Sequence, residues 1–191
     1  MPPKFKFSKE QIIQAALELT REGGISSVTA KNVGEKLNSS VKVVFGQFAN
    51  MEEVRSEVVK AADEMCRTYM QDMMESGKYP PYKASGIAYI SFAKEEKELF
   101  KLLYMRDRSQ EKFNDKDDLQ PLVAELQKIT GFSEDDAYRF QLEMWMYVHG
   151  IAVMIATSYL EWDMDMINSV LSDAYLGLKY RFSEKNLDSE K

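Results

Sequence analysis

Residues 12–54 read IIQAALELTREGGISSVTAKNVGEKLNSSVKVVFGQFANMEEV, and this stretch decides the fold of the N-terminal region. Just before it, Ser8 followed by Gln11 is a capping-box pattern that predicts the start of a first helix. Apolar residues then recur at helical spacing. Gly23 and Gly24 are typical of the position just past a helix C-terminus, so they predict its end.

A second and a third helix are predicted next, joined by a polar turn. Thr29 predicts the N-cap of the second helix, and Ser39 or Ser40 can cap the third. Spacing on the third helix predicts four inward side chains, namely Val41, Val44, Phe45 and Phe48. Four residues then face outward, namely Lys42, Val43, Gly46 and Gln47. Three short helices with a tight turn between the last two are the layout of a helix-turn-helix.

A helix-turn-helix braces its second helix across the DNA backbone and lays its third helix in the major groove. Hydroxyl groups and free N–H groups at helix starts suit phosphate, and a lysine can reach a guanine edge or a phosphate. The residues expected to contact DNA are Thr29, Lys31, Ser39, Ser40, Lys42, Val43, Phe45, Gly46 and Gln47.

Charge is unevenly distributed along the chain. The net charge of the 191 residues is −6, which argues against a general nucleic-acid binder. Residues 1–50 carry seven Lys/Arg and four Asp/Glu, a net of +3, so the remainder carries −9. A modestly basic N-terminal segment followed by an acidic remainder suits a protein that binds DNA through its N-terminal part.

Helical signals also dominate the rest of the chain, and no convincing strand alternation is found. Helices are expected at about 51–74, 82–94, 97–104, 119–130, 133–157 and 164–182. On the first of these, the expected buried stripe is Val54, Val58, Ala61, Met65 and Tyr69. We therefore predict an all-α fold of about nine helices.

The location expected of the chain is the cytoplasm. Its one cysteine, Cys66, cannot form an internal disulfide, and no signal peptide is visible after the start MPPKFKF. The longest uncharged run, Met144–Leu160, is at the lower edge of the ~17–25 residues of a membrane span and is interpreted as a buried helix.

Residues 12–54 resemble the N-terminal domain of the tetracycline-repressor (TetR) family, over about a quarter of the chain. The matching features are Ala15-Ala16-Leu17, the Gly24 turn, Val28-Thr29, Leu37, the serine turn and the run Phe48–Asn50–Glu53–Val54. Trp145 followed by His149-Gly150 resembles a signature of one subgroup of ligand domains in that family.

The resemblance implies a helix-turn-helix DNA-binding domain at 1–50, a helical-bundle ligand-binding and dimerisation domain at 51–182, and a disordered tail at 183–191. The ligand site it implies is rich in Met and aromatic residues and consists of Phe92, Phe100, Tyr104, Met105, Trp145, Met146 and His149. The alternative interpretation is that residues of these types form an ordinary hydrophobic core. The dimer interface it implies comprises Gly150, Val153, Met154, Thr157, Ser169, Ser172, Tyr175 and Leu176. The expected partners are palindromic operator DNA, a second copy of the chain and a small apolar effector, with no cofactor, metal or membrane.

The chain departs from the family pattern in the DNA-reading region. Phe45 stands where the family usually has Tyr, Met51 where it has Lys, and Gln47 near a usual Tyr or His. The missing Tyr and Lys normally bind phosphates, and Gly46 costs the recognition helix about 1 kcal/mol relative to Ala. A TetR-like protein that has lost operator binding and acts as an adaptor is therefore the first alternative.

An enzyme on a helical bundle is the second alternative, and little in the sequence favours it. His149 is the only histidine, so neither a His-dependent triad nor a Cys/His zinc site is expected. Asp117-Asp118 and Asp135-Asp136 can be read as paired carboxylates, but Asp is common at loops and helix starts. We therefore predict a ligand-responsive regulator, most simply a repressor, and no enzyme.

Overall fold

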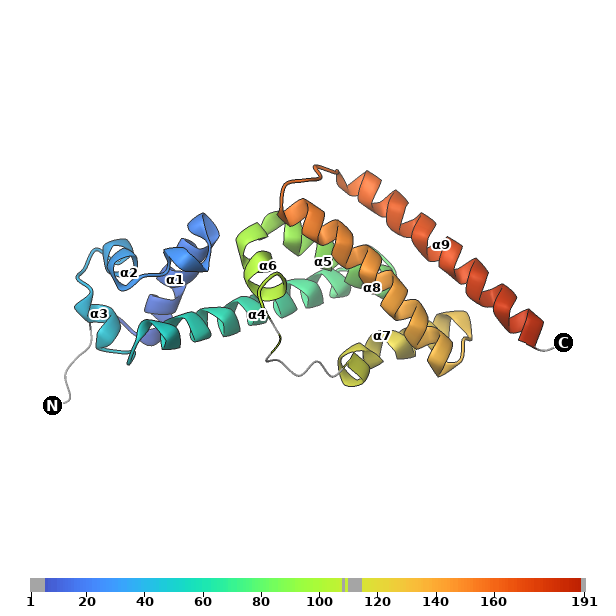
Figure 1. Ribbon diagram of the computed structural model, residues 1–191, viewed down its shortest axis with the longest axis horizontal. Coiled ribbons are helices and arrows are strands. Elements are labelled where there is room, and N and C mark those ends of the chain that lie inside the picture. Colours follow the sequence, from blue (N-terminus) through green and yellow to red (C-terminus); the bar gives the residue numbers. More distant parts are fainter. Residues whose placement is uncertain (1–5, 108, 110–114, 190–191) are drawn as a thin grey trace. The chain divides into compact units, whose positions relative to one another are not determined.

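The computed structural model describes residues 6–107, 109 and 115–189, and every regular element within these ranges is helical. The elements are α1 (Lys9–Gly23), η1 (Ile25–Ser27), α2 (Ala30–Lys36), α3 (Lys42–Phe45), α4 (Met51–Glu75), α5 (Pro81–Glu95), α6 (Lys97–Tyr104), α7 (Asp115–Thr130), α8 (Glu134–Ala156) and α9 (Met164–Ser189). Figure 1 labels the α-helices along the chain. The prediction of an all-α fold with about nine helices is confirmed.

The chain divides into two compact units. The first comprises Met1–Tyr69 and Glu95–Arg106, and the second comprises Met70–Lys94 and Asp107–Lys191. The predicted boundary at residue 50 therefore differs from the observed one, which falls within α4 and assigns α6 to the first unit. The first unit needs α6 because α1 packs against it as well as against α2.

Local signals in the sequence explain how α1 begins and ends. Ser8 Oγ accepts a hydrogen bond from Gln11 N, and Gln11 Oε1 accepts one from Ser8 N, so the predicted capping box is confirmed. Gly24 ends the helix with φ +71°, a backbone conformation that side chains with a Cβ rarely adopt. Arg21 then forms two hydrogen bonds of 2.8 Å to the Glu96 carboxylate, which tie α1 to the start of α6.

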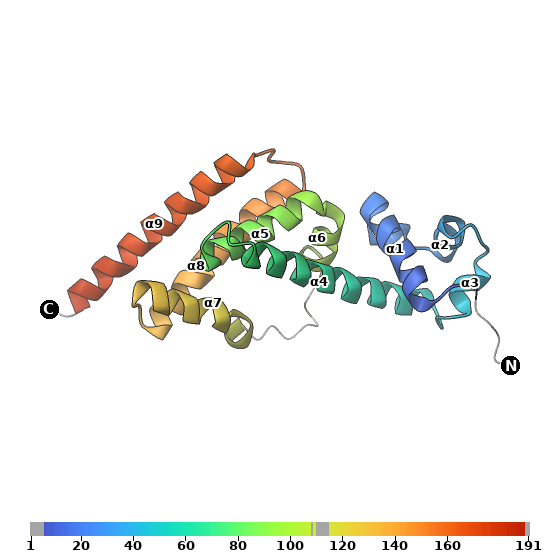
Figure 2. The ribbon, with the colours of Figure 1, turned by 180° about the vertical axis from the view of Figure 1, so that it is seen from behind.

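The buried stripe of α4 differs from the predicted one after Val58. Ala62 and Cys66 are fully buried, whereas the predicted Ala61 and Met65 are only half-buried. A step of four residues from Val58 to Ala62 and again to Cys66 keeps the stripe on one side of a helix. Figures 1 and 2 both show α1, α2 and α3 gathered at the N-terminal end of α4, within the first unit.

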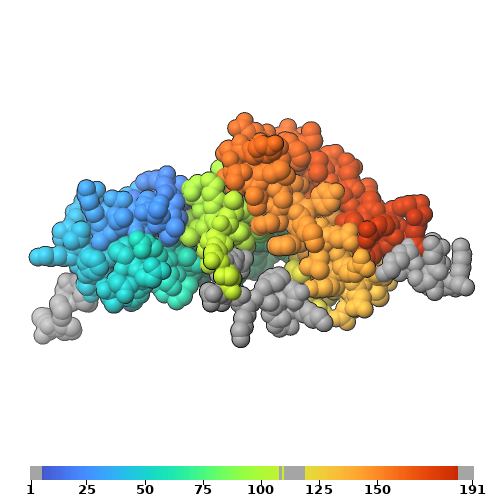
Figure 3. All heavy atoms as spheres, in the orientation of Figure 1, coloured from blue at the N-terminus to red at the C-terminus, as the bar shows by residue number. Residues whose placement is uncertain are grey.

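The core of the second unit includes three phenylalanines and lies where α7, α8 and α9 pack together. α8 contacts both α7 and α9. The buried cluster consists of Val123, Leu126, Phe132, Ala137, Phe140, Met144 and Phe182. Figure 3 shows α8 and α9 adjoining on one face of this unit.

Two expectations about the C-terminal half can be compared with the structure. The backbone of α9 is helical through Ser189, past the predicted end at Phe182, while residues 190–191 lie outside the described part of the chain. The uncharged run Met144–Leu160 forms the C-terminal part of α8 and the turn after it. Within the described ranges, no helix has both the length and the apolar character that crossing a membrane requires.

Candidate functional site

A close backbone approach holds α2 and the turn before α3 together. A Cβ on Gly34 would lie 3.0 Å from the carbonyl carbon of Ser40 and 3.1 Å from the nitrogen of Val41. Ser39 N donates a hydrogen bond of 2.8 Å to Gly34 O, and Asn38 turns the chain with φ +48°. Thr29 Oγ1 accepts a hydrogen bond from Asn32 N, so the predicted N-cap of α2 is confirmed. The helix-turn-helix geometry thus depends on a glycine that the sequence reasoning did not single out.

The third helix of the motif is shorter than predicted. α3 is a single turn, Lys42–Phe45, whose N-cap is Val41 and which has no side-chain cap, so the prediction of a Ser39 or Ser40 cap is wrong. Val44 and Phe48 are buried as predicted, but Val41 and Phe45 are 42% and 51% exposed, so their predicted inward orientation is also wrong. A one-turn helix has one packed face, and Val44 and Phe48 already fill it.

Several residues predicted to contact DNA lie on the surface of this motif. Lys31, Ser40, Lys42 and Gly46 are exposed, Val43 is half-buried and Phe45 presents its ring to solvent. Gln47 is different, because its Nε2 donates a hydrogen bond of 2.8 Å to Phe7 O and so holds the N-terminal segment against the motif. Beside it, Lys6 Nζ lies 3.4 Å from Ser39 Oγ.

The lysines of this region differ in how far they are already neutralised. Lys36 forms ion pairs with Glu18 at 3.2 Å and Glu22 at 2.7 Å, and Lys31 lies 3.9 Å from Glu35. Lys42 makes no ion pair with any residue that the structure describes. Its ammonium is therefore the cation of α3 that is available to an anionic partner.

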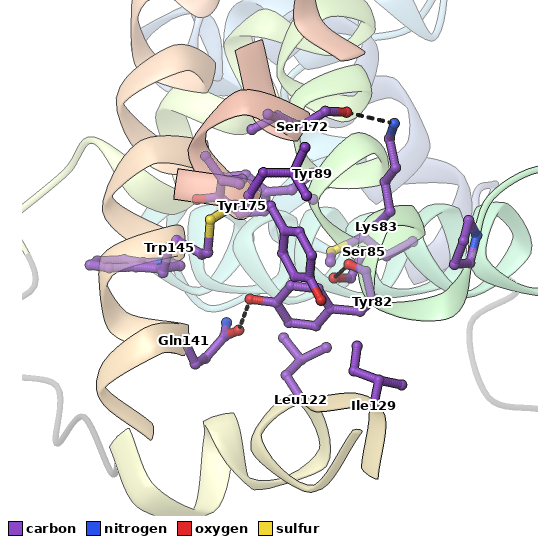
Figure 4. Close-up of a pocket in the computed structure, with 17 residues that line it drawn as sticks. Tyr82, Lys83, Ser85, Tyr89, Leu122, Ile129, Gln141, Trp145, Ser172 and Tyr175 are labelled. Atoms are coloured by element: carbon purple, nitrogen blue, oxygen red, sulfur yellow. Dashed lines mark hydrogen bonds between the residues drawn. The ribbon is translucent and has the colours of Figure 1, made fainter. Parts of the chain in front are cut away.

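A cavity of about 410 Å³ lies within the second unit. Its volume is in the range of sites that hold small molecules. Side chains from the end of α4 and from α5, α7, α8 and α9 surround it, and Figure 4 shows their arrangement. The lining residues are Met70, Pro80, Tyr82, Lys83, Ser85, Gly86, Tyr89, Leu122, Ile129, Gln141, Met144, Trp145, Val148, Leu171, Ser172, Tyr175 and Leu176.

The few polar groups of the cavity are held by specific hydrogen bonds. Tyr82 Oη donates to Gln141 Oε1 at 2.8 Å, and burial raises the pKa of the Tyr82 phenol well above its usual value. Lys83 Nζ donates to Ser172 Oγ at 3.1 Å. The Tyr89 hydroxyl lies 3.0 Å from His149 Nδ1. These bonds fix the polar side chains around an otherwise apolar space.

Comparisons with known proteins cover both the cavity and the N-terminal motif. Residues 82–173, which supply most of the cavity lining, match the family described as tetracyclin repressor-like, C-terminal domain. The chain is also 24% identical over 174 residues to an uncharacterized HTH-type transcriptional regulator, YobS, of Bacillus subtilis (strain 168). That similarity covers 89% of this chain and 90% of the relative.

The residues predicted to bind a ligand do not gather around one cavity. Of the seven, Trp145 lines the cavity of the second unit, and its ring stacks on His149 at a centroid distance of 5.2 Å. His149 reaches the cavity through the hydroxyl of Tyr89. The others lie elsewhere: Phe92 is buried, Met146 is 60% exposed, and Phe100, Tyr104 and Met105 belong to the first unit.

The residues predicted to form a dimer interface fall into two groups. Ser172, Tyr175 and Leu176 line the cavity. The others lie along α8 and α9 and are half-buried or exposed: Gly150, Val153, Met154, Thr157 and Ser169. The same two helices and the turn between them also expose large apolar side chains, namely Met146, Tyr147, Tyr159, Met166, Leu176 and Tyr180.

Most residues that line the cavity were not predicted to bind a ligand, and three polar ones among them are Tyr82, Lys83 and Gln141. Gln141 is 5% exposed on a helix that buries mainly apolar side chains, and Lys83 precedes the apolar run of α5. A polar residue inside an apolar helical pattern, or directly before one, is the signal that could have identified both.

The remaining candidate residues of the sequence are the two acidic pairs and the cysteine. Asp136 N donates a hydrogen bond to Ser133 Oγ at the first turn of α8, as expected for a capped helix start. The side chains of Asp117 and Asp118 lie outside the described part of the chain. The Cys66 thiol is buried 3.4 Å from the Tyr104 hydroxyl, and this burial raises its pKa.

Proposed function

We propose that this chain is a transcriptional regulator of the tetracycline-repressor type, which binds palindromic operator DNA as a homodimer in the cytoplasm and is released by a small effector. The observation that carries the proposal is a helix-turn-helix built around Gly34, followed along the chain by a tetracyclin repressor-like domain with a cavity. The name of the Bacillus subtilis relative supports it. The resemblance of Trp145 and His149-Gly150 to the signature of one subgroup supports assigning the chain to that subgroup within the proposal.

In this proposal the exposed face of the motif contacts DNA. Lys42 supplies a cation on α3 that makes no ion pair within the described ranges, and the turn before it supplies the exposed Ser40. Lys6 and Ser39 lie within 3.4 Å of each other and add a basic group beside the turn. Phosphate contacts of this kind position a protein on the duplex, whereas contacts to base edges carry specificity.

The proposed dimer forms through α8 and α9. Two recognition helices must meet successive major grooves ~34–36 Å apart, and a two-fold dimer sets that spacing. The apolar side chains exposed on α8 and α9 favour this pairing, because such a surface is stabilised when a second copy covers it.

The effector is proposed to act through α4, which is shared by both units. Met70 near its C-terminal end lines the cavity, and its N-terminal turns bury Val54 and Val58 in the first unit. A ligand that displaces α4 changes the separation of the two recognition helices. Because coupling between binding sites is reciprocal, DNA must weaken effector binding by the same factor.

A pair of charge-removing substitutions tests the DNA-binding face. Lys42→Ala is expected to weaken binding to the upstream duplex and to lower the salt slope of log affinity by about one, since one phosphate contact is lost. Lys60→Ala is the matched control, because Lys60 is an exposed lysine of the same unit that pairs with Glu57. Equal affinity and salt slope for Lys42→Ala and the wild type would contradict the proposed DNA-binding face.

The adaptor alternative is favoured by one specific observation. α3 is a single uncapped turn that exposes Phe45, and Met51 begins α4 where the family carries a lysine. The double substitution Phe45→Tyr/Met51→Lys distinguishes the two functions in the same titration. A large gain from negligible affinity supports the adaptor, whereas a modest gain on measurable wild-type affinity supports the regulator.

A further inference from the structure

We infer that the effector is an amphiphile with one anionic head, which pairs with Lys83 while its apolar body fills the rest of the cavity. This inference rests on the proposed function, since it takes the cavity to be the effector site. It narrows the proposed effector from a small apolar molecule to an apolar molecule with a carboxylate or a similar monoanion.

Among the residues that the structure describes, Lys83 is the single charged one that lines the cavity, and no Asp or Glu of these residues lines it. The side chain is half-buried and makes no ion pair with any residue of the described ranges. An ammonium beside apolar walls interacts strongly with an opposite charge, because the low local dielectric screens the attraction less than water does. The electrostatic potential in the cavity is therefore positive beside the ammonium of Lys83.

The ammonium of Lys83 is positioned rather than free to swing. Its Nζ donates to Ser172 Oγ at 3.1 Å and lies 5.7 Å from the centre of the Tyr79 ring. Ser172 Oγ in turn donates to Asn168 O at 2.7 Å, so the serine oxygen remains an acceptor for the lysine. Lysine has three N–H donors, and the bond to Ser172 uses one of them. The remaining donors can serve the oxygens of an anionic head.

The arrangement of the other lining residues gives the bound molecule a direction. Figure 4 places the Lys83–Ser172 bond on one side of the cavity and the apolar side chains of Leu122 and Ile129 on the opposite side. An amphiphile fits this layout with its head at Lys83 and its body toward α7. A wholly apolar ligand would instead remove water from the ammonium without replacing it, which is unfavourable.

Isothermal titration calorimetry of the full chain with decanoate and with decanol tests the inference. The two probes share an apolar chain and differ in the charge of the head. We expect decanoate to bind the wild type at least about tenfold more tightly, the effect of a charge-assisted hydrogen bond. Lys83→Met should remove this preference by weakening decanoate, and Lys128→Met, which removes an exposed lysine of the same unit, should retain it.

The outcomes separate this inference from the proposed function. Equal binding of both probes to the wild type, or a preference for decanoate that survives in Lys83→Met, overturns the anionic head but leaves the cavity as an effector site. Absence of binding by either probe contradicts the apolar effector site itself and the inference with it. The comparison of probes on the wild type does not depend on the folding of any variant.

Discussion

Gly34→Ala is expected to destabilise the first unit, although Ala is the better helix former. A Cβ at this position would lie 3.0 Å from Ser40 C, 3.1 Å from Val41 N and 3.2 Å from Ser39 O. All three atoms belong to the backbone, so no side-chain rotation relieves the contact. Helix propensity favours Ala by about 1 kcal/mol. Overpacking costs about 1–3 kcal/mol, and the upper half of that range applies where backbone must move. Subtracting the gain in helix propensity leaves a net loss of stability of about 1–2 kcal/mol.

The assay for Gly34→Ala is urea unfolding followed by circular dichroism, with DNA binding measured on the same preparation. Gly177→Ala is the control, since a Cβ there meets nothing within 4 Å inside the chain. That control should gain up to about 1 kcal/mol from helix propensity. Because the displaced turn also carries Ser39 and Ser40, Gly34→Ala should bind DNA more weakly. A variant as stable as the wild type with full DNA affinity would refute the role assigned to Gly34.

Three further predictions concern an ion pair, a thiol and the dimer. Glu96→Gln should lower the free energy of unfolding by about 0.5–1 kcal/mol, because it weakens the two-bond, partly exposed pair with Arg21. The Cys66 thiol should react slowly with Ellman's reagent in the native state, since burial disfavours the thiolate. Its raised pKa means that its contribution to stability is complete below the ordinary thiol pKa and is lost as the pH rises toward the folded value. Gly150→Ala should weaken the homodimer about tenfold in sedimentation equilibrium, because a methyl group between closely packed helices costs on the order of 1–3 kcal/mol.

Each of these predictions has a matched control or a contrary result. Glu52→Gln is the control for the ion pair, as Glu52 is highly exposed and its loss should change stability little. A native Cys66 that reacts as fast as the unfolded chain contradicts its burial. For Gly150→Ala, no atom of the same chain lies within 4 Å of the new Cβ, so an unchanged dimer with higher stability would place Gly150 outside the interface.

Elements fixed by local chemistry were predictable from the sequence. The capping box at Ser8, the cap at Thr29 and the glycine end of α1 each depend on residues within one helical turn, and each is confirmed. Which side chains of α3 point inward was not predictable in the same way. A prediction from helical spacing assumes that the rest of the protein packs along one whole face of the helix. Because α3 is a single turn, Val41 and Phe45 are not covered in this way and remain exposed.

The cavity was predicted only in its general character. Met and aromatic residues do line it, but residue type alone does not distinguish a cavity wall from a packed core, so Phe92 is buried and Phe100 lies in the other unit. The lysine and glutamine of the cavity carry the more specific signal, because a polar side chain in an apolar helical run needs a partner. The close contact at Gly34 depends on the path of the following turn and is not visible in the spacing of residues.

The central claim is that the chain reads a DNA sequence, and fluorescence anisotropy with DNA from its own upstream region tests it most directly. The titration is run across a salt series beside a scrambled duplex of equal length. We predict tighter binding to the upstream duplex than to the scrambled one. The slope of log affinity against log salt concentration should give the number of phosphate contacts that the helix-turn-helix makes. Weak and equal binding of the wild type to both duplexes, together with a large gain of affinity in Phe45→Tyr/Met51→Lys, would contradict the claim.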